Sequence, residues 1–468
     1  MNKREFGDCF NEECALIGVW NHQEAANLAY LGLYSQQHRG QEGAGIVSYN
    51  DDNCKLYIHK GIGLVSEVFD DFDFQRLPGR NAIGHVRYST AGDCRLAEVQ
   101  PFQAEISNGR MALAQNGNLI NNAELRSGLI KEGAIFTSTS DTESILHLIA
   151  RKAQKNPPVK AVIEALPSIK GAYSLLILFN DRLIAARDPN GLRPLVLGEI
   201  NGSYVLASET CAFDLIGATF VRDIEPGEIV EISGSKDIAS HFPFGKSKGT
   251  PCIFEYVYFS RPDSTWNGKN VYQARKKMGH ELAKESPIEA DIVVPVPDSG
   301  VAAAIGFSEE SGIPFEMGLI RNHYVGRTFI EPQQSIRDFG VKIKHNANKQ
   351  ILNGKRVVVV DDSIVRGTTT KKLIKMFRAA GAKEIHVRIT APPTKGSCFY
   401  GIDTPTQEQL IAHQMSVEEI KEYIDADSLA YLSIDGLYRA VNSEKGSMCD
   451  ACFTKNYPIG VPSSCTVE

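Results

Sequence analysis

The chain has 468 residues, of which 43% are hydrophobic and 23% charged, and this composition predicts a globular protein of roughly two to four domains. The net charge of −6 argues against a partner held by bulk charge, such as nucleic acid or an acidic membrane. No apolar run approaches the roughly 18–20 residues of a membrane span, and no apolar segment typical of a secretory signal follows Lys3 and Arg4, so we expect a cytoplasmic protein.

Short apolar runs separated by glycine turns fill residues 15 to 231, a pattern that is typical of strands. Helical stretches interrupt these runs, so we predict layered sheets with helices outside, in a sandwich or α+β arrangement. The predicted strands are Leu16–Trp20, Gly43–Ser48, Ala82–Tyr88, Met111–Ala114, Tyr173–Phe179, Leu183–Ala186, Tyr204–Ala207 and Glu228–Ile232. The predicted helices are Ala25–Gln37, Asp141–Ala153 and Val159–Ile169.

The polar stretch Ser233–Gly249 predicts a domain boundary, and a new rhythm follows it. Strands now alternate with helices that begin near Ser299 and Thr368, which predicts a parallel sheet and an α/β domain. Beyond Thr406 we expect mainly helix, with a cysteine-containing tail. The predicted strands of this part are Ile292–Pro295, Val357–Val360 and Ile385–Thr390.

The segment Val357–Thr370, VVVVDDSIVRGTTT, joins a buried strand to a helix through polar residues. Asp361 and Asp362 follow the strand at its carboxyl end, where ligands bind in open α/β sheets. Gly367 allows close backbone approach, and the N–H groups at the start of the helix attract a phosphate. The paired carboxylates suit ribose hydroxyls and Mg²⁺. The alternative is a plain turn in which the two aspartates only cap a helix.

The complete string resembles the phosphoribosyl diphosphate loop of type I phosphoribosyltransferases, which implies the parallel-sheet domain of that family. The resemblance implies that phosphoribosyl diphosphate contacts Asp361, Asp362, Ser363, Arg366, Gly367, Thr368, Thr369 and Thr370. One Mg²⁺ per subunit is expected on Asp361, Asp362 and Ser299, the last within Pro295–Gly300 (PVPDSG). The basic, aromatic segment Asn322–Pro332 is interpreted as a lid over the substrate, with an exposed loop as the alternative.

Cys14 stands directly before the apolar strand, where a cysteine is either a core thiol or a nucleophile. Together with four later groups of residues it resembles the class II glutamine amidotransferases, whose fold is the N-terminal-nucleophile hydrolase αββα sandwich. The matching groups are Cys14; His38-Arg39-Gly40-Gln41-Glu42; Gly84-His85-Val86-Arg87-Tyr88; Asn116-Gly117-Asn118; and Ser140-Asp141-Thr142-Glu143.

The resemblance implies that Met1–Glu13 is a propeptide, removed so that Cys14 becomes the first residue. An α-amino group has a pKa of about 7.7–8.0, so it is partly neutral at physiological pH and can act as the base for the adjacent thiol. Asn116 and the N–H of Gly117 are the implied oxyanion donors. Implied glutamine-binding residues are Arg87 for the carboxylate, Asp141 for the α-ammonium group and Arg39 in support of the pocket.

Two positions depart from the family pattern: Ala15 replaces the usual glycine, and Gln115 replaces the usual histidine. Ala15 adds a Cβ beside the nucleophile, which predicts a tighter pocket. Neither change removes a catalytic group, so we expect an effect on rate rather than on identity. Cys9 is a competing nucleophile, but no strand follows it.

The chain has ten cysteines, and the expected reducing compartment argues against a disulfide framework. Cys449 and Cys452 form a C-x-x-C pair, and Cys252 and Cys398 lie far from it in the sequence. The spacing of these four cysteines does not distinguish a [4Fe–4S] cluster from a Zn²⁺ ion, since four thiolates can hold either. A third interpretation is that the four are unrelated core thiols. One branch of the glutamine phosphoribosyldiphosphate amidotransferases has cysteines at these four places, and this resemblance implies a propeptide and one [4Fe–4S] cluster per subunit.

The resemblances together cover nearly the whole chain and imply three parts: a propeptide at residues 1–13, a glutaminase domain at 14–240, and a phosphoribosyltransferase domain with a cluster-binding tail at 250–468. The implied enzyme hydrolyses glutamine at Cys14 and passes ammonia inside the protein to a second site. There ammonia displaces pyrophosphate from phosphoribosyl diphosphate and gives 5-phosphoribosylamine, the first step of purine synthesis. The family further implies a homotetramer inhibited by purine nucleotides.

Two other classes of protein share one half of this pattern. Glutamine–fructose-6-phosphate amidotransferases have the glutaminase domain but lack the DDSIVRGTTT loop. Purine-responsive repressors have a phosphoribosyltransferase-like domain but lack the glutaminase half and would carry a basic DNA-binding domain. Neither fits Cys14 and Val357–Thr370 together, so we expect small-molecule substrates and no nucleic acid or membrane partner.

Overall fold

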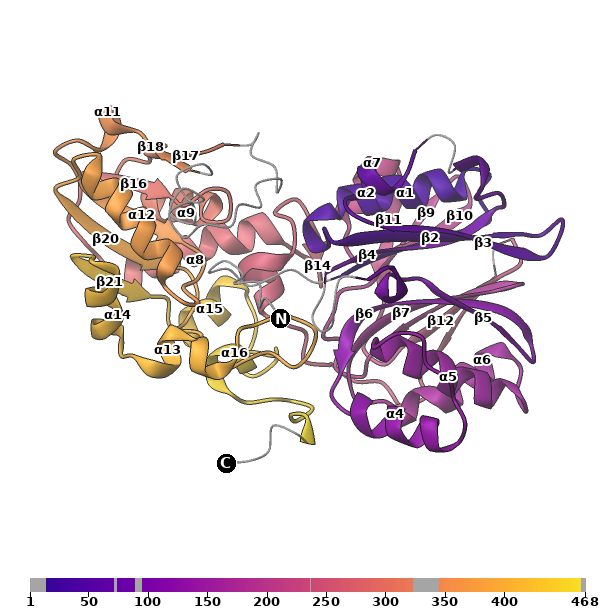
Figure 1. Cartoon of the computed structure of the whole chain (residues 1–468). Helices are drawn as coiled ribbons and strands as arrows, with labels where there is room; N and C mark the ends of the chain where they lie inside the picture. Colours follow the sequence, from indigo (N-terminus) through magenta and orange to yellow (C-terminus); the bar gives the residue numbers. More distant parts are fainter. Residues whose placement is uncertain (1–13, 71–73, 89–94, 236, 323–344, 464–468) are drawn as a thin grey trace.

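The structure is a computed structural model that describes residues 14–70, 74–88, 95–235, 237–322 and 345–463. The chain forms two halves that lie side by side (Figure 1). One half contains two stacked antiparallel sheets, and the other contains a parallel sheet with helices on both faces. The prediction of an N-terminal-nucleophile hydrolase sandwich followed by a phosphoribosyltransferase-type domain is confirmed.

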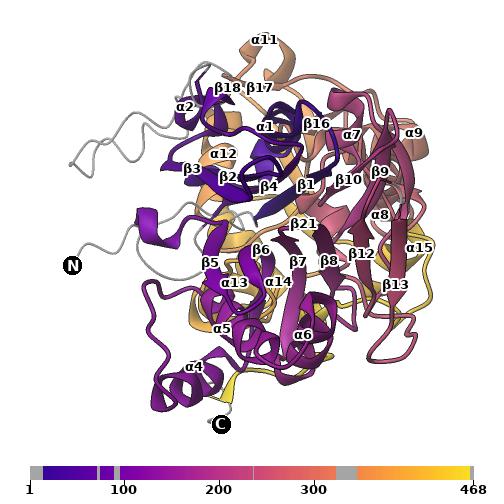
Figure 2. The same ribbon diagram turned by 90° about the vertical axis from the view of Figure 1, so that its right-hand side faces the viewer.

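The first half is an αββα sandwich. Its first sheet has the strand order β11-β9-β10-β1-β4-β2-β3, and its second has the order β13-β12-β8-β7-β6-β5. Buried side chains such as Leu16, Leu176 and Leu206 fill the space between the sheets. Helices α1, α2 and α7 cover the outer face of the first sheet, and α4, α5 and α6 cover that of the second (Figures 1 and 2).

The strands of the sandwich are β1 (Ala15–Trp20), β2 (Gly43–Asn50), β3 (Lys55–Ile62), β4 (Asn81–Arg87), β5 (Phe102–Ile106), β6 (Gly109–Leu119), β7 (Gly171–Phe179), β8 (Arg182–Arg187), β9 (Val196–Ile200), β10 (Ser203–Ala207), β11 (Thr219–Asp223), β12 (Ile229–Ser233) and β13 (Asp237–His241). Its helices are α1 (Ala25–Ser35), α2 (Val65–Val68), α4 (Asn122–Lys131), α5 (Asp141–Ala153), α6 (Pro158–Ala165) and α7 (Cys211–Ile216). Short 3₁₀ turns lie at Gln37–Arg39, Leu96–Glu98 and Leu166–Ser168.

The second half is built on a parallel sheet with the strand order β16-β19-β20-β21. Alternate residues of β19 point to opposite faces, so Val357 and Val359 pack under α12 and α14, while Val358 and Val360 pack under α8 and α9. Burial on both faces explains the run of four valines. Helix α15 packs into the same buried cluster as Val358 and Val360.

The elements of the second half begin with a π-helical turn, η4 (Glu255–Phe259). Its strands are β14 (Thr265–Trp266), β15 (Lys269–Asn270), β16 (Ile292–Pro295), β17 (Leu319–Arg321), β18 (His345–Ala347), β19 (Arg356–Asp361), β20 (Glu384–Ile389) and β21 (Ser428–Tyr431). Its helices are α8 (Val271–Glu285), α9 (Val301–Ser311), α11 (Lys349–Leu352), α12 (Thr368–Ala379), α13 (Ile411–Gln414), α14 (Val417–Ile424), α15 (Ile434–Ala440) and α16 (Ala451–Thr454), with a 3₁₀ turn at Gln407–Gln409.

Three elements differ from the sequence predictions. The polar stretch Ser233–Gly249 contains the edge strand β13. Most side chains of β13 are exposed, so its sequence lacks the apolar alternation by which strands are predicted. The predicted helix Val159–Ile169 ends earlier, because its last turn is a separate 3₁₀ segment. The stretch beyond Thr406 contains the strand β21 as well as helices. Within the described residues, no helix has both the length and the apolar character needed to cross a membrane.

Candidate active sites

Cys14 lies immediately before β1, at the end of a central strand of the first sheet. Its side chain is half-buried, and Sγ lies 3.8 Å from the carbonyl oxygen of Tyr88. Side chains alternate along a strand, and Ala15 packs in the core beneath α1, while Leu16 packs between the two sheets. The methyl group of Ala15 therefore points away from the face on which Cys14 lies. The expectation that Ala15 tightens the pocket is wrong for this reason.

The predicted oxyanion residues lie on β6, which belongs to the facing sheet. Asn116 is 1% exposed, and neither its Nδ2 nor its Oδ1 atom has a hydrogen-bond partner among the described residues. A buried polar group without a partner costs about 1–3 kcal/mol, so such groups are rare unless they serve a ligand. Gly117 has a φ of +143°, and a Cβ there would lie 2.1 Å from the carbonyl oxygen of Ala172, so only glycine fits.

Arg87 ends β4, a strand that packs against β6 across the sandwich. The side chain is 6% exposed, and its Nη1 atom is also buried with no hydrogen-bond partner in the part of the chain that the structure describes. A guanidinium group with a buried, unused donor suits a carboxylate ligand, which would satisfy the donor and neutralise the charge. The unused donors of Arg87 and Asn116 therefore support the predicted glutamine site.

Asp141 is the first residue of α5, and its Oδ2 atom accepts hydrogen bonds from the backbone N–H of Leu119 at 2.8 Å and from Nε2 of Gln115 at 3.3 Å. Burial raises the pKa of Asp141 to about 6. The Oε1 atom of Gln115 accepts a hydrogen bond from the hydroxyl group of Thr142 at 2.9 Å. Gln115, noted in the sequence only as a departure from the family, thus orients the predicted partner of the substrate ammonium group.

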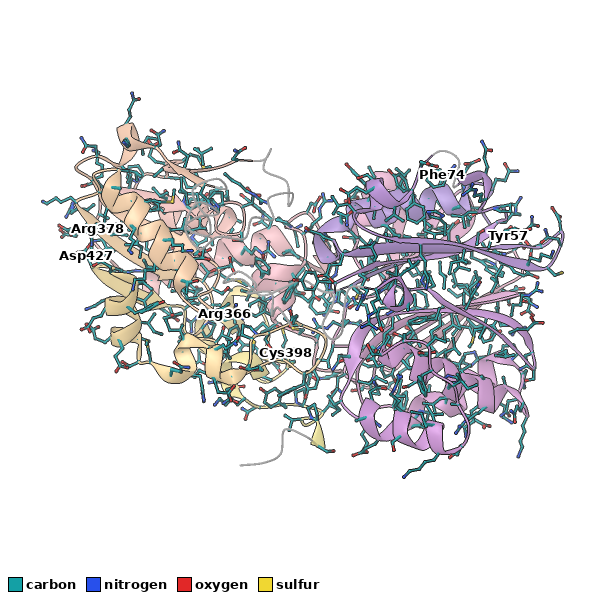
Figure 3. All side chains as sticks on the ribbon, in the orientation of Figure 1. Tyr57, Phe74, Arg366, Arg378, Cys398 and Asp427 are labelled. Carbon is teal, nitrogen blue, oxygen red and sulfur yellow. The ribbon has the colours of Figure 1, made fainter. Side chains whose placement is uncertain are left out.

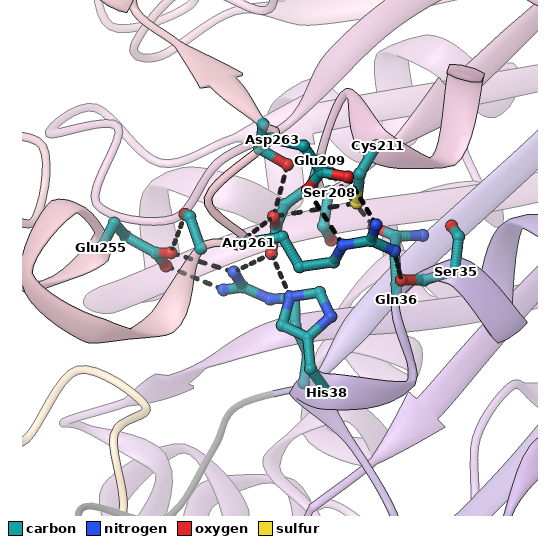
Figure 4. Close-up of polar contacts among 12 residues, drawn as sticks. Ser35, Gln36, His38, Ser208, Glu209, Cys211, Glu255, Arg261 and Asp263 are labelled. Carbon is teal, nitrogen blue, oxygen red and sulfur yellow. Dashed lines mark hydrogen bonds and ion pairs between the residues drawn. The ribbon is translucent and has the colours of Figure 1, made fainter. Parts of the chain in front are cut away.

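Arg39 is 1% exposed and lies behind the nucleophile. Its Nε donates to the carbonyl oxygen of Cys14 at 3.3 Å, and its Nη atoms pair with Glu209 at 2.7 Å and with Glu255 at 2.8 Å. Figure 4 labels these two glutamates and His38. Burial opposes ionisation of Glu209, but the charges of His38 and Arg39 outweigh it and lower its pKa. Arg39 therefore contacts the backbone of Cys14, and both its support of the pocket and its binding of glutamine stay predictions.

Glu209 and Glu255 were missed by the sequence analysis. Glu209 follows β10, and besides Arg39 it accepts hydrogen bonds from His38 at 2.8 Å and from Ser264 at 2.7 Å. Glu255 belongs to η4 in the second half, so the Arg39–Glu255 pair joins the two halves. The only sequence signal is an acidic residue within the apolar run Cys252–Phe259.

The phosphoribosyl loop connects β19 to α12. Asp361 ends β19, and its Oδ1 atom accepts the backbone N–H of Asp362 at 2.9 Å, while the hydroxyl group of Ser363 donates to Asp362 at 2.7 Å. Burial, and then the negative charge of Asp362, raise the pKa of Asp361 well above its usual value. Two carboxyl groups this close favour a bound cation or hydroxyl donors between them.

The helix α12 begins directly after Gly367, which has a φ of +77°. Gly367, the residue before the helix, has no side chain to cap it, and a helix start of this kind is a place where a phosphate can bind. Arg366, labelled in Figure 3, donates to Gln409 at 2.9 Å. Thr368 is exposed and Thr370 is buried.

Ser299 lies on the turn between β16 and α9, and β16 is the neighbour of β19 in the sheet. Gly300 packs so closely on the end of β19 that a Cβ there would lie 2.4 Å from the carbonyl oxygen of Val360. The predicted Mg²⁺ ligands therefore share one edge of the sheet. Of the predicted lid Asn322–Pro332, all but Asn322 falls outside the described residues.

Known proteins resemble both halves of the chain. A family model described as a glutamine amidotransferase domain matches residues 85–214, and one described as a phosphoribosyl transferase domain matches residues 267–404. The amidophosphoribosyltransferase of Rhizobium etli is 52% identical over 460 residues, which cover 97% of this chain and 92% of that protein. The chain belongs to the amidophosphoribosyltransferase family.

Other amidophosphoribosyltransferases also match this chain over nearly its whole length. The Bacillus subtilis protein is 50% identical over 458 residues, which cover 96% of this chain and 95% of that protein. A solved structure described as the allosteric regulatory enzyme of purine biosynthesis is 48% identical, with a TM-score of 0.91 over 96% of this chain and 97% of that one. The chain is therefore an enzyme of this family, a pentosyltransferase, and both alternative classes are excluded because each lacks one half.

Of the four predicted ligand cysteines, Cys398 lies near the junction of the two halves (Figure 3). Cys252 and Cys449 are paired in an isolated β-bridge. Cys398 packs against two buried clusters, one that contains Cys252 and Cys452 and one that contains Cys449. Burial, and then the charges of the other three thiols, raise the pKa of Cys452. Within the described ranges, no three His, Cys, Asp or Glu side chains are placed to hold a metal ion.

Proposed function

We propose that this enzyme hydrolyses glutamine at Cys14 and passes the ammonia through the protein to phosphoribosyl diphosphate, releasing pyrophosphate and 5-phosphoribosylamine at the entry to purine synthesis. The thiolate of Cys14 attacks the side-chain amide, and the mature α-amino group takes the proton of the thiol. Asn116 Nδ2 and the N–H of Gly117 stabilise the tetrahedral oxyanion, and water later releases glutamate. Arg87 binds the substrate carboxylate and Asp141 its ammonium group.

The observation that carries the glutaminase half of this proposal is the buried amide of Asn116, which has no partner within the described protein. The test compares the two nitrogen donors. The wild-type protein should release pyrophosphate from phosphoribosyl diphosphate with either glutamine or ammonium, and glutamate should form in step with pyrophosphate when glutamine is the donor. Activity with only one donor, or glutamate formation with no pyrophosphate, would exclude a two-site enzyme.

The second site is proposed to hold one Mg²⁺ per subunit on Asp361 and Asp362, with Ser299 at the same edge. Two mutually repelling carboxylates and a hydroxyl group fit a hard cation that completes its shell with water and substrate phosphates. When bound, Mg²⁺ neutralises charge on the leaving pyrophosphate. The start of α12, directly after Gly367, is where the ribose phosphate would bind, and the roles of Ser363, Arg366 and the threonines stay predictions.

The glutaminase should lose activity as the pH falls through about 6, because the protonated form of Asp141 cannot pair with the ammonium group of glutamine. The α-amino base titrates at about 7.7–8.0, so log(kcat/KM) for glutamine should fall with a slope of about one below that pH and about two below pH 6. Burial also raises the pKa of Asp188 to about 6, so Asp141→Asn is needed to assign the step. That variant should raise the KM and remove the steeper limb; a profile that keeps this limb would refute the assignment.

We also propose one [4Fe–4S] cluster per subunit, held by Cys252, Cys398, Cys449 and Cys452. Four thiols gathered from three distant segments are the donor set that such a cluster uses. A Zn²⁺ ion would use the same four thiols, so metal analysis must decide between the two. The cluster would tie the start of the second half to the C-terminal tail.

The purified protein should be brown and contain about four irons per chain. Cys452→Ser should lose most of the iron, because a buried ligand is removed, whereas Cys54→Ser should keep it, because Cys54 is exposed on the opposite half. Iron and sulfide analysis with the visible spectrum provides the measurement. A colourless protein with stoichiometric zinc would contradict the cluster.

The remaining proposals concern processing, assembly and regulation. We propose that Met1–Glu13 is removed and that the domains span residues 14–240 and 250–468. Residues 1–13 lie outside the described part of the chain.

The structure of the glutamine phosphoribosylpyrophosphate amidotransferase of Bacillus subtilis was solved with ADP and GMP. It matches this chain at 48% identity, with a TM-score of 0.90 over 96% of this chain and 98% of that one. This supports inhibition by purine nucleotides here; a cytoplasmic homotetramer is carried from the family.

A further inference from the structure

A loop of the second half, Phe399–Gly401, lies directly against the strand that carries the predicted oxyanion donors. The Nδ2 atom of Asn118 donates to the carbonyl oxygen of Phe399 at 2.9 Å, although the two residues are 281 positions apart. Gly401, with a φ of +107°, sits so close that a Cβ there would lie 3.0 Å from the Cα atom of Gly117. The loop therefore touches both the residue that follows Gly117 and Gly117 itself.

A second anchor holds the same loop from the other side. Arg193 is fully buried, and its Nε and Nη2 atoms donate to the carbonyl oxygen of Tyr400 at 2.9 and 2.8 Å. The carbonyl oxygen of Arg193 in turn accepts the hydroxyl group of Ser174, which pairs with Asn116 across β6 and β7. Ala172, the pairing partner of Asn118, packs with Tyr400 in a buried apolar cluster. The loop Phe399–Gly401 is thus linked both to Asn118 on β6 and, through Arg193 and Ala172, to the paired strand β7.

We propose that Phe399–Gly401 is a supporting part of the glutaminase site, and that Asn118, Arg193 and Gly401 are positioning residues that fix the oxyanion donors. The inference rests on the proposed roles of Asn116 and Gly117. An N–H donor stabilises the oxyanion only when it is held at hydrogen-bond distance from the place where the charge develops. The end of β6 has β7 on one side, and on the other side β5 ends its pairing at Leu113. Beyond that point the backbone N–H groups of Gln115 and Leu119 donate to Gln100 and Asp141, and contact from the second half adds a restraint at Gly117 and Asn118.

The test uses the full-length Asn118→Ala protein. We expect the glutamine-dependent kcat to fall about tenfold with little change in KM, a fraction of the 10²–10³ lost when an oxyanion donor is removed outright. Ammonium-dependent pyrophosphate release should not change. Alkylation of Cys14 by iodoacetamide should also keep its rate, because that displacement forms no tetrahedral oxyanion, whereas general damage to the pocket would slow it.

Asn121→Ala is the matched control. Asn121 also donates to a backbone carbonyl, that of Ser168 at 3.0 Å, but within its own half, so the control should keep the wild-type kcat. Gly401→Ala is an independent variant, and it should lower the glutamine-dependent kcat while leaving the ammonium-dependent rate, because its Cβ presses on Gly117.

Wild-type kcat with glutamine in both Asn118→Ala and Gly401→Ala would overturn the inference. An equal fall in the ammonium-dependent rate or in the alkylation of Cys14 would also overturn it. The proposed function fails separately: it fails if Asn116→Ala keeps full glutamine-dependent activity. If Asn116→Ala is inactive while Asn118→Ala is normal, only the positioning role of the loop is lost.

Discussion

The Cys14→Ala protein should release no measurable pyrophosphate with glutamine, yet it should use ammonium as well as the unchanged chain does. A methyl group cannot attack the amide, and removing the nucleophile of a comparable acyl-transfer enzyme costs about 10⁶-fold in kcat. The proposed acceptor site lies on β16, β19 and α12 in the other half, so we expect it to accept ammonia from solvent without Cys14. The two activities are measured as pyrophosphate release at saturating phosphoribosyl diphosphate.

The control for this variant is Cys54→Ala, because Cys54 is an exposed thiol on the same half and should be silent. Loss of both activities, or retention of both, would contradict two separate sites. The intact mass of the wild-type protein should show that Met1–Glu13 is absent. An uncleaved chain with full glutamine-dependent activity would instead remove the α-amino group as the base for Cys14.

The parts of the two sites that the sequence predicts are those written in short continuous strings. Val357–Val360 must be a strand buried on both faces, and the polar residues after it must lie at its carboxyl end, so the loop and its edge of the sheet follow from local pattern alone. Cys14 was predicted as the nucleophile from a family resemblance carried by five short groups of residues, each continuous in itself but spread from Cys14 to Glu143.

The parts that could not be predicted depend on contacts between distant segments. Glu209 is 170 positions from Arg39, and Glu255 is 216 positions away, so nothing in the local sequence pairs them. The contact of Asn118 with Phe399 spans 281 positions. Gln115 was visible as an unusual residue, but its role required the position of Asp141 on α5. Ala15 was misjudged because the face of β1 to which it points is set by packing under α1.

Replacing both loop carboxylates, Asp361→Asn with Asp362→Asn, should abolish pyrophosphate release with either nitrogen donor, the opposite pattern to that of Cys14→Ala. The pair lies at the end of β19, where burial and the charge of Asp362 already raise the pKa of Asp361, so the site is poised for a cation or hydroxyl donors. Charge stabilisation by a metal is worth several kcal/mol, which corresponds to a loss of about 10³-fold or more. Steady-state rates with glutamine and with ammonium provide the measurement.

Asp291→Asn is the matched control, because Asp291 pairs with Arg356 at the opposite, amino-terminal edge of the same sheet. It should leave both rates near wild type. Alkylation of Cys14 should proceed normally in the doubly substituted protein, since the glutaminase half keeps its own core between two sheets. If the ammonium-dependent rate survives without Asp361 and Asp362, these carboxylates do not hold the acceptor. If Cys14 also becomes unreactive, the variant has damaged the junction between the halves, and a two-site division of labour would not explain the result.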